Sequence, residues 1–365
     1  MKKLSILHTE SSTGWGGQEI RVLTEAVELK KRGCRVIIAC QSGSQLSKRC
    51  RDAEIKAVEI GMNRSFSPSA CFKIYKLIKQ ERVDIVNTHS SNDSWIASAA
   101  AKMAGIKIVR TRHIDVPISN NPLNFIYRLP DKIITTSEAI KIRLIGNGVQ
   151  EGKIHCIPTG VDLCRFRPAA GREDLKRELG ILNRYPVVTN VAVLRSWKGH
   201  SFLFRAVSDV IKYFSDAVFL IVGDGHQREA LEGLIDELNI KSSVIMTGHR
   251  DDVQDILNIT DLFVLSSTKY EGIPQALLQA MAANVPIVST NVDGVKDIIK
   301  DMETGIIAEP SNPGSLSEKI LYALRNIDNI RTMADKSRRL AEGYYSLDKM
   351  VDRLEELYGE LTAIK

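Results

Sequence analysis

Short apolar β-rich runs alternate with helix-like segments along most of this chain, and this alternation limits the folds that it can adopt. The runs that predict strands are "LSILHT", "RVIIAC", "VDIVNT", "KIVRT" and "KIITTS", followed after residue 184 by "PVVTNVAV", "AVFLIVG", "SVIMTG", "DLFVLSS" and "VPIVST". Apolar residues at helical spacing predict helices over residues 20–32, 201–214, 227–238 and 316–326. Alternation of this kind is typical of parallel sheets covered by helices on both faces.

The length and a gap in the strand series divide the chain into two domains. A chain of 365 residues exceeds one typical hydrophobic core. The strand series has a gap near residues 167–185. The stretch "PTGVDLCRFRPAAGRED", which begins before this gap, supplies a hinge with proline and glycine at both ends. We therefore expect an α/β protein with two doubly wound, Rossmann-like domains over residues 1–167 and 168–345. The two domains are expected to face one another across a cleft that holds the ligand.

Composition describes a folded globular chain. Hydrophobic residues make up 44% of the sequence and charged residues 26%. No apolar run approaches membrane-spanning length, and "MKKLSILHTE" turns polar too soon for a secretory signal, so we expect cytoplasmic residence. The six cysteines form no C-x-x-C pair, which favours buried free thiols over a metal site.

Charge is divided unevenly between the two halves. Residues 1–167 carry 27 Lys and Arg against 15 Asp and Glu, and the remainder carries 23 against 29. This difference favours an anionic partner for the first domain, such as a phosphorylated acceptor or the inner face of a membrane; the alternative is two solvated surfaces of unequal sign. Within "CFKIYKLIKQER", lysines flank an apolar stripe of Ile74, Leu77 and Ile78, which fits a membrane-surface helix or a helix packed on a sheet.

The stretch "KYEGIPQALLQAMAANVPIVST" predicts a ligand-binding loop at the start of a helix. Pro274 suits the first helical turn, and Asn284 suits a left-handed stop before the next strand. Glu271 and Gly272 then lie ahead of the helix, where free backbone amides face phosphate or hydroxyl oxygens. The preceding run "DLFVLSS" delivers this loop to the carboxyl edge of the sheet, where open α/β sheets bind ligands.

Two glycine-rich turns follow predicted strands in the two halves. "TGWGGQEIRVL" places Gly16 and Gly17 at a strand-to-helix turn, and "IVGDGHQRE" repeats the arrangement with Gly223 and Asp224. The first lacks the G-x-G-x-x-G spacing of dinucleotide-binding loops. Either turn alone fits a purely structural role, whereas the pair favours phosphate-binding loops.

Together these stretches resemble the retaining nucleotide-sugar glycosyltransferases of family 4 over nearly the whole chain. The matching motifs are "GWGGQEIRVL", "PTGVDLCRFRP", "LRSWKGH", "VGDG", "TGHRDDV", "EGIPQALLQAMAANVPIVST", "GVKDII" and "TGIIAEP". The resemblance implies the two-domain GT-B fold, with an acceptor-side first domain and a donor-binding second domain. It also implies that the last helix, about 346–365, packs back on the first domain. A nucleotide diphosphate sugar is the expected co-substrate and a glycan or lipid-linked hydroxyl the acceptor. No cofactor, metal or nucleic acid is expected.

The resemblance also implies roles for particular residues. Glu271 matches a clamp on the donor sugar, and Lys198 matches the cation that neutralises the departing diphosphate. Arg195 is assigned to the same diphosphate, although the commoner family position is occupied here by Val193. The expected donor-binding residues are Gly16, Gly17, Gly223, Asp224, Gly248, His249, Gly272, Ile273, Pro274 and Gln279. His113 matches a histidine near the reacting sugar, with a strand-end structural histidine as the alternative, and His89 is a candidate on the acceptor side.

Gln279 departs from the family pattern, in which a second glutamate contacts the ribose. Glutamine keeps the hydrogen-bonding capacity and lacks the charge, so weaker donor binding is the expected result. A transition state with oxocarbenium character needs cations and amides at the leaving phosphate, which the residues above supply. "RDD" at 250–252 suits a helix N-cap better than a metal-binding pair.

Three functions stay open from the sequence: a retaining glycosyltransferase of surface polysaccharide or lipid-linked glycan synthesis, another GT-B-like enzyme such as an epimerase or a phosphorylase, and a non-catalytic nucleotide-sugar binding protein.

Overall fold

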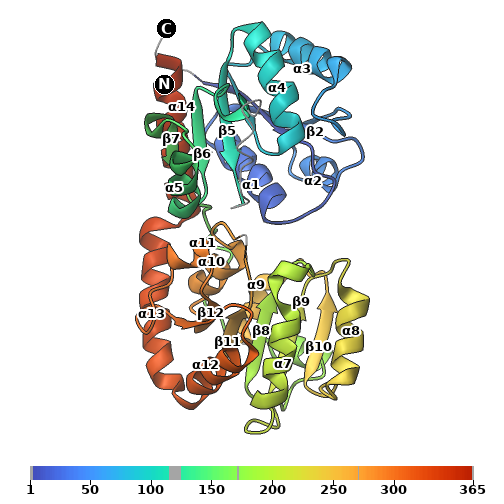
Figure 1. Ribbon diagram of the computed structural model, residues 1–365, viewed down its shortest axis with the longest axis vertical. Coiled ribbons are helices and arrows are strands. Elements are labelled where there is room, and N and C mark those ends of the chain that lie inside the picture. Colours follow the sequence, from blue (N-terminus) through green and yellow to red (C-terminus); the bar gives the residue numbers. More distant parts are fainter. Residues whose placement is uncertain (1–2, 115–124, 171, 270, 364–365) are drawn as a thin grey trace. The chain divides into compact units, whose positions relative to one another are not determined.

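The chain forms two compact units, each built on one parallel sheet (Figure 1). The computed structural model describes residues 3–114, 125–170, 172–269 and 271–363. The N-terminal unit comprises Met1–Thr159 and Asp348–Lys365, and the C-terminal unit comprises Gly160–Leu347. The predicted fold class, two Rossmann-like α/β domains, is confirmed.

The N-terminal unit has a seven-stranded sheet in the order β3-β2-β1-β4-β5-β6-β7. Its strands are β1 (Ser5–Glu10), β2 (Arg35–Cys40), β3 (Lys56–Glu59), β4 (Ile85–Thr88), β5 (Lys107–Arg112), β6 (Lys132–Thr135) and β7 (Ile154–Cys156). Its helices are α1 (Gly17–Lys31), α2 (Gln45–Asp52), α3 (Pro68–Gln80), α4 (Ser91–Ala104), α5 (Glu138–Gly146) and α14 (Leu347–Ala363). Strands β1 and β4 are buried along their whole length, as expected of central strands in a parallel sheet.

The C-terminal unit repeats this strand order with six strands, β10-β9-β8-β11-β12-β13. The strands are β8 (Val187–Val191), β9 (Val218–Val222), β10 (Val244–Gly248), β11 (Leu262–Leu265), β12 (Ile287–Thr290) and β13 (Ile306–Ala308). The helices are α6 (Glu173–Glu178), α7 (His200–Val210), α8 (Arg228–Glu237), α9 (Val253–Asn258), α10 (Gln275–Ala282), α11 (Asp293–Lys296), α12 (Pro313–Arg325) and α13 (Ile327–Tyr344).

Both strand orders reverse direction once, and this reversal locates the candidate sites. The reversal lies between β1 and β4 in the N-terminal unit and between β8 and β11 in the C-terminal unit. Open α/β sheets bind ligands at such reversals, beyond the carboxyl ends of the strands. The segments that follow these four strands are therefore the candidate ligand-binding segments.

The last helix, α14, belongs to the N-terminal unit although it is the end of the chain. Met350, Leu354 and Leu357 are buried. Asn87 on β4 donates a hydrogen bond to the buried Tyr358 hydroxyl at 2.9 Å. At its exposed side, Arg32 forms ion pairs with acidic side chains of the helix. The sheet thus holds α14 by apolar contact and by a buried hydrogen bond.

The division between the units falls after Thr159, earlier than the predicted boundary at 167. The segment after it packs on the C-terminal unit: the amide of Val161 donates to the Tyr345 carbonyl at 2.8 Å, and Phe166 lies in that unit's core. A Cβ atom on Gly160 would lie 2.6 Å from Cα of Leu347. The boundary therefore lies eight residues before the predicted one, because the apolar residues of the predicted hinge are core residues of the C-terminal unit.

The apolar stripe of α3 is part of the core of the N-terminal unit. Ile74, Leu77 and Ile78 are buried there, together with residues of α4. These side chains are not available to a membrane, so the alternative in which the helix packs within the domain is correct for the stripe.

Candidate active site

Lys198 and Glu271 contact one another where the strand order of the C-terminal unit reverses. Lys198 ends a short 3-10 turn, Ser196–Lys198, that follows β8, and Glu271 lies in the segment between β11 and α10. The Lys198 ammonium lies 2.5 Å from Oε1 of Glu271, and Ser267 Oγ donates to the same oxygen at 2.5 Å. The Glu271 side chain is only 8% exposed, so Glu271 is not a solvent-exposed loop charge. A cation and a carboxylate are thus held together at the predicted edge.

Backbone contacts fix the Lys198 turn against the segment after β11. The Thr268 amide donates to the Trp197 carbonyl at 2.8 Å, and Ser266 Oγ donates to the Lys198 carbonyl at 2.9 Å. Gly199 has φ of +69°, and a Cβ atom there would lie 1.9 Å from the Ser266 carbonyl oxygen. Glycine is therefore required directly after Lys198, both for its conformation and for this close approach.

The segment ahead of α10 presents backbone amides beside Glu271. Helix α10 begins at Gln275. Pro274 is its N-cap residue, whereas the sequence predicted Pro274 in the first turn of the helix. Asn284 has a left-handed backbone conformation, as predicted, with φ of +59°. Within the described residues, the amides of Gly272 and Ile273 donate to no acceptor. Two amides at a helix N-terminus are thus free to bind anionic or hydroxyl oxygens.

A second close approach of backbone fixes this segment. A Cβ atom on Gly294 would lie 1.8 Å from the Gly272 carbonyl oxygen, so the "VDGVKDII" motif packs its glycine on the loop. Gln279 lies one turn into α10, half buried, and its side chain makes no hydrogen bond within the described part of the chain. Its amide is therefore available to a ligand.

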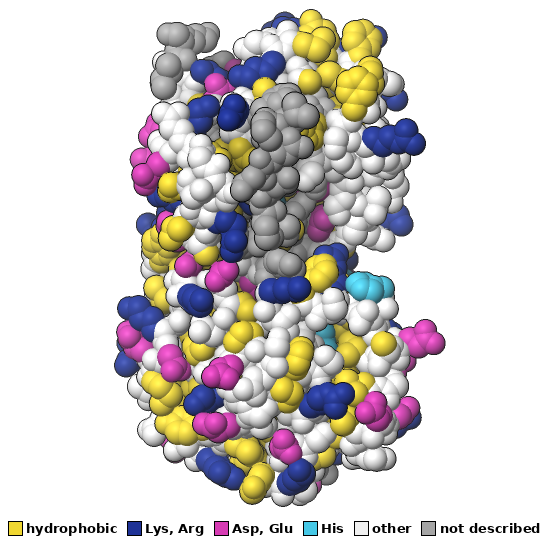
Figure 2. All heavy atoms as spheres, viewed as in Figure 1, with side chains coloured by type: hydrophobic (Ala, Val, Ile, Leu, Met, Phe, Trp, Pro, Cys, Tyr) yellow, Lys and Arg dark blue, Asp and Glu magenta, His cyan; other side chains and the backbone are white. Residues whose placement is uncertain are grey.

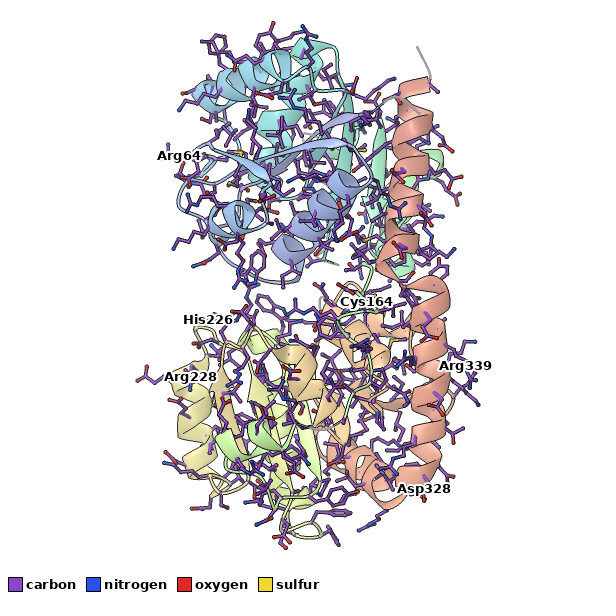
Figure 3. All side chains as sticks on the ribbon, turned by 180° about the vertical axis from the view of Figure 1, so that it is seen from behind. Arg64, Cys164, His226, Arg228, Asp328 and Arg339 are labelled. Carbon is purple, nitrogen blue, oxygen red and sulfur yellow. The ribbon has the colours of Figure 1, made fainter. Side chains whose placement is uncertain are left out.

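The glycine turns after β9 and β10 lie beside the segment that follows β8. Gly223 has φ of +135°, and a Cβ atom there would lie 2.0 Å from the Ala192 carbonyl oxygen. Its amide donates to the Gly248 carbonyl at 2.9 Å, which joins the two turns. Asp224 accepts from the Gly225 amide at 2.7 Å. At the start of α8, Arg228 (Figure 3) donates to the Met246 carbonyl at 3.4 Å.

Two predicted residues stand apart from the Lys198–Glu271 pair. Arg195 is exposed, and its guanidinium lies over the Trp197 ring at 5.3 Å. It makes no described contact with Lys198 or Glu271, so the structure places it as a surface guanidinium. The His249 side chain is 53% exposed and lies 3.4 Å from Asp251. Its backbone follows β10, as the sequence predicted, while its imidazole points to the surface.

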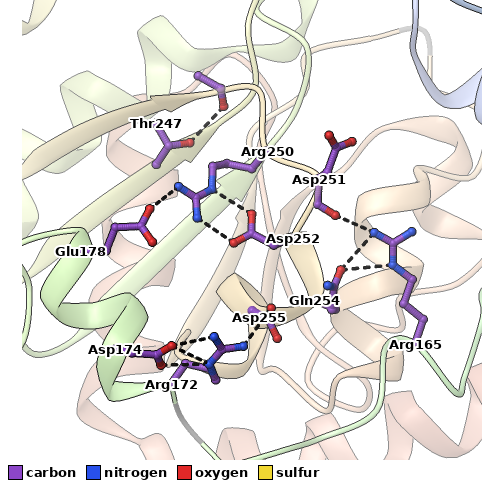
Figure 4. Close-up of polar contacts among 11 residues, drawn as sticks. Arg165, Arg172, Asp174, Glu178, Thr247, Arg250, Asp251, Asp252, Gln254 and Asp255 are labelled. Atoms are coloured by element: carbon purple, nitrogen blue, oxygen red, sulfur yellow. Dashed lines mark hydrogen bonds and ion pairs between the residues drawn. The ribbon is translucent and has the colours of Figure 1, made fainter. Parts of the chain in front are cut away.

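The "RDD" motif forms the start of α9, and its carboxylates take part in ion pairs (Figure 4). Asp252 is the N-cap residue, as predicted, but its side chain makes no capping hydrogen bond. Arg250 instead holds both oxygens of Asp252 at 2.8 and 2.6 Å and contacts Glu178 at 2.7 Å (Figure 4). These hydrogen bonds from Arg250 lower the pKa of Asp252. Asp252 thus stabilises the start of α9 through its ion pair with Arg250.

In the glycine-rich turn of the N-terminal unit, one of the two amides predicted to bind the donor already donates a hydrogen bond within the chain. The Gly16 amide donates to Oε2 of Glu19 at 2.8 Å and so caps α1. This amide is therefore hydrogen-bonded within the chain, and the donor-binding role of Gly16 stays a prediction. Gly17 is the first residue of α1 and keeps a helix-start amide without an intrahelical acceptor.

Three histidines form a hydrogen-bonded row at the strand reversal of the N-terminal unit. His8 Nδ1 lies 2.9 Å from His89 Nε2, and His89 Nδ1 lies 2.9 Å from His113 Nε2. All three are buried, and burial lowers the pKa of each, with neighbouring positive charge as a second cause for His89 and His113. The structure therefore brings together His89 and His113, which the sequence analysis selected, and adds His8, which it missed.

Two buried acidic side chains lie at the same edge of the sheet, and one of them, Asp93, contacts the row. Asp93 accepts from the His89 amide at 3.0 Å and from Thr9 Oγ1 at 2.8 Å. Glu10 accepts from the Ser12 amide at 2.8 Å and from Gln18 Nε2 at 2.6 Å. Burial first, and then the Asp93 charge, raises the pKa of Glu10 to about 8. The sequence offered no signal for these residues beyond their place at a strand end and a helix start.

One group of described residues has the composition of a metal site. His8, Glu25 and His89 each offer one atom, and these atoms lie within 4.8 Å of one another. Glu25 is already paired with the Arg21 guanidinium at 2.6 Å. A cation would have to share this carboxylate with a buried guanidinium, and the donor set therefore does not fit a resident metal ion.

Two family models match the chain and together cover most of it. Residues 15–165 match the model described as Glycosyltransferase Family 4, and residues 171–340 match the model described as Glycosyl transferases group 1. The chain belongs to the family 4 glycosyltransferases. Nucleotide sugars are the donors of this class of enzyme. The sheet reversal of the C-terminal unit, between β8 and β11, lies in the second matched segment, and β4 of the N-terminal reversal lies in the first.

Characterised relatives of this glycosyltransferase span most of its length. The UDP-Gal:alpha-D-GlcNAc-diphosphoundecaprenol alpha-1,3-galactosyltransferase of Escherichia coli is 29% identical over 308 residues, which are 80% of this chain and 79% of the relative. The N-acetyl-alpha-D-glucosaminyl L-malate synthase of Bacillus anthracis is 27% identical over 79% of this chain and 78% of its own length.

Solved structures show the same fold. A glycosyltransferase from Rickettsia africae superimposes with a TM-score of 0.88 at 24% identity, covering 100% of both chains. Anabaena HepE in complex with UDP-glucose superimposes with a TM-score of 0.88 at 18% identity, covering 98% of this chain and 100% of the other. The fold is therefore GT-B. Among the described residues, no helix combines the length and the apolar character needed to cross a lipid bilayer.

Proposed function

We propose that this glycosyltransferase moves a sugar from a UDP sugar to a hydroxyl of a lipid-linked or polysaccharide acceptor, with retention of anomeric configuration. The observation that carries the proposal is the contact between Lys198 and Glu271 at 2.5 Å. The two side chains are matched to the two parts of a nucleotide sugar. An ammonium suits the diphosphate, and a carboxylate, which only accepts hydrogen bonds, suits sugar hydroxyls.

Donor binding separates this pair in the proposed mechanism. The diphosphate carries more charge than a carboxylate and takes over the Lys198 ammonium, which leaves Glu271 free to accept from the sugar. Ser267 keeps Glu271 in place meanwhile, because its hydroxyl donates to Oε1 at 2.5 Å. The amides of Gly272 and Ile273 add two donors at the positive end of α10.

Catalysis is assigned to stabilisation of the leaving diphosphate. Negative charge grows on the phosphate as the bond between the sugar and the phosphate breaks. Lys198 and the free amides therefore bind the diphosphate more strongly in the transition state than in the ground state. We propose that the leaving phosphate itself removes the proton of the acceptor hydroxyl, and that the reaction needs no metal and no cofactor. Arg195 joins the phosphate only if its side chain leaves Trp197, and we therefore assign it a smaller part than Lys198.

The names of the relatives support the choice of donor and acceptor. The Escherichia coli relative is named for UDP-Gal and for a diphosphoundecaprenol-linked acceptor. A related donor pocket in this chain is expected to accept a UDP sugar, and we assign the neutral amide of the half-buried Gln279 to the ribose.

The experiment is release of nucleotide from UDP, GDP and ADP sugars in the absence and presence of lipid-linked acceptors. We expect release from a UDP sugar, and a loss of about 100-fold in rate in Lys198→Ala and Glu271→Ala, the size typical of removing one preorganised stabilising group. Lys212→Ala is the matched control, because Lys212 is an exposed lysine paired with Asp209. Retention is read from the anomeric coupling constant of the product.

Two results would contradict the proposal. Binding of UDP sugars without any turnover would favour a non-catalytic nucleotide-sugar binding protein. Turnover that Lys198→Ala and Glu271→Ala leave unchanged would place the chemistry elsewhere.

We also propose that α3 and the loop before it meet an anionic membrane that carries the acceptor. Phe66 and Phe72 are exposed, at 84% and 52%, and the Lys76 ammonium lies 4.7 Å from the Phe72 ring centre. Figure 2 shows hydrophobic side chains gathered beside basic ones over the α3 end of the N-terminal unit. Exposed aromatic rings flanked by lysines suit the interface of an anionic bilayer.

Flotation with vesicles tests this proposal. We expect binding to vesicles that contain phosphatidylglycerol and a loss of binding in the double variant Phe66→Ser, Phe72→Ser. Tyr213→Ser is the control, because Tyr213 is an exposed aromatic residue 4.9 Å from the Arg325 guanidinium in the other unit. Equal binding of all three proteins would contradict a role for this surface.

A further inference from the structure

The row of three histidines in the N-terminal unit can carry its hydrogen bonds in only two senses. His8 and His89 stack with ring centres 5.1 Å apart, and His89 and His113 have centres 5.2 Å apart. Both contacts between rings join Nδ1 of one imidazole to Nε2 of the next, at 2.9 Å each. A neutral imidazole has one N–H and one bare nitrogen. If one ring of the row carries its proton on Nε2, the other two must do the same.

The two senses place different groups at the ends of the row. With all protons on Nε2, His113 donates to His89, His89 donates to His8, and His8 has an N–H at the inner end. His113 then has a bare Nδ1 at the outer end. With all protons on Nδ1, every bond is reversed, and His113 has an N–H at the outer end.

Glu25 on α1 lies near the inner end of the row, because one of its oxygens lies within 4.8 Å of a nitrogen of His8 and its charge acts on the pKa of His8. We use it to distinguish the two senses. His8 Nε2 is buried and has no hydrogen-bond partner, and Oε2 of Glu25 is likewise buried and without a partner. The other Glu25 oxygen is held by Arg21 at 2.6 Å, and Arg21 also donates to Thr159 at 3.1 Å. A buried carboxylate with one unpartnered oxygen therefore lies near the inner histidine, on a helix fixed by two polar contacts.

Electrostatics favours a proton on His8 Nε2. An N–H dipole directed toward a buried carboxylate is attracted to it, either directly or through one bridging water, and both unpartnered atoms then gain a partner. A bare Nε2 would instead oppose its lone pair to that of the carboxylate and leave two buried acceptors unsatisfied. Such unsatisfied buried groups are costly.

We propose that Glu25 is a positioning residue that fixes the tautomer of His113 through His8 and His89, leaving His113 Nδ1 as a hydrogen-bond acceptor for a ligand hydroxyl. Nδ1 has no partner among the described residues, and it is not one of the fully buried atoms. A neutral acceptor nitrogen suits a sugar or polyol hydroxyl and rejects a carbonyl or an ether oxygen. The role with substrate rests on the proposed glycosyltransferase function, whereas the tautomer does not.

The tautomer can be measured without substrate by long-range 1H–15N spectra of the protein labelled in histidine. The chain has seven histidines, few enough to assign with single His→Asn variants. We expect His8, His89 and His113 to carry their protons on Nε2. A proton on His113 Nδ1 in the unchanged protein would overturn the proposal, whatever the outcome of the activity assays.

Glu25→Gln tests the cause of that tautomer. The glutamine NH2 can donate to a bare His8 Nε2, so we expect the His113 proton to move to Nδ1 in this variant. Glu28→Gln makes the same change of charge one turn away on α1, where Glu28 pairs with Lys31, and is expected to leave the tautomer unchanged. Retention of the Nε2 proton in Glu25→Gln would overturn the assignment to Glu25. If Glu25→Gln does not fold, Glu25→Asp, which keeps the carboxylate, is expected to keep the Nε2 tautomer, and the spectra of the unchanged protein still decide.

Activity provides a second readout. We expect Glu25→Gln to lower kcat/KM for the donor that is turned over by about tenfold, the effect of losing one hydrogen bond in the transition state. A changed tautomer with unchanged kcat/KM would overturn the role of His113 toward substrate. Absence of turnover in the unchanged protein would instead count against the proposed function and not against the tautomer.

Discussion

Gly199 lies directly against the carbonyl group of Ser266, so that a Cβ atom on residue 199 would be 1.9 Å from that oxygen. This contact joins the turn that carries Lys198 to the strand end that leads to Glu271. Because Gly199 also has φ of +69°, a side chain at this position is disfavoured by its conformation as well as by its surroundings.

Gly199→Ala is therefore expected to destabilise the protein and to displace Lys198. We expect a loss of at least about 2 kcal/mol in the free energy of unfolding, together with weaker donor binding. Gly233→Ala is the control, because Gly233 lies inside α8 with no atom within 4 Å of the added methyl group. It is expected to be neutral or to stabilise by up to about 1 kcal/mol. Urea unfolding of both variants measures the difference, and equal stabilities would refute the role of the contact.

Gln279→Glu is expected to strengthen donor binding. The half-buried side chain at position 279 makes no hydrogen bond within the described residues, and a carboxylate accepts more strongly from ribose hydroxyls than an amide does. We expect affinity for the UDP sugar to rise about fivefold, with kcat little changed, because the ribose is remote from the bond that breaks. Calorimetric titration checks this. An unchanged or weaker affinity would show that Gln279 does not face the ribose.

Glu10 is expected to make stability fall as the pH rises above 6.5. Its pKa in the folded protein is about 8, above its ordinary value of 4.5, because the carboxyl is buried near Asp93. Between these values the folded state binds a proton that the unfolded state has lost, so raising the pH through 8 removes stability. The buried histidines, whose folded pKa values are lowered, act below pH 6.5 and with the opposite sign.

Measurement of the free energy of unfolding between pH 6.5 and 8.5 tests this sign. We expect a decrease of about 1 kcal/mol or more in the unchanged protein and a flatter profile in Glu10→Gln. A profile that rises with pH, or the same slope in both proteins, would be inconsistent with a protonated Glu10.

Helix α14 is attached by buried apolar residues and by a surface ion pair, and their contributions to the free energy of unfolding can be measured separately. Leu354 is completely buried, whereas Asp352 forms an exposed ion pair with Arg32 at 2.6 Å. We expect Leu354→Ala to cost about 2–5 kcal/mol and Asp352→Ala less than about 1 kcal/mol. Denaturant unfolding of the two variants checks the ranking. Comparable losses would mean that the ion pair contributes as much as the apolar face and would contradict this ranking.

Much of the fold could be predicted because both sheets are parallel and their central strands are continuous apolar runs. The strands that the pattern missed are the edge strands β3, β7 and β13, with three or four residues each. Such short segments show no periodicity of their own and are defined by pairing with a neighbour. Helix α13 was missed for a similar reason, since its charged surface conceals the few buried positions at Ile330, Ala334 and Ala341.

The site was predictable where backbone geometry leaves a mark on the sequence. Gly199, Gly223 and Gly294 are glycines because carbonyl groups occupy the space of a side chain, so motifs that contain them predicted the loops. Arg195 shows the opposite case, since a motif cannot tell which way a long flexible side chain turns. His8 and Glu25 gave no local signal, because strand and helix spacing alone does not reveal that they lie near one another.

Affinity for UDP is the most direct test of the central claim that Lys198 binds the diphosphate. Isothermal titration of Lys198→Ala should give a Kd at least about tenfold weaker than that of the unchanged protein, with Lys212→Ala unchanged. A Kd for Lys198→Ala equal to that of Lys212→Ala, in a variant shown to be folded, would contradict the claim.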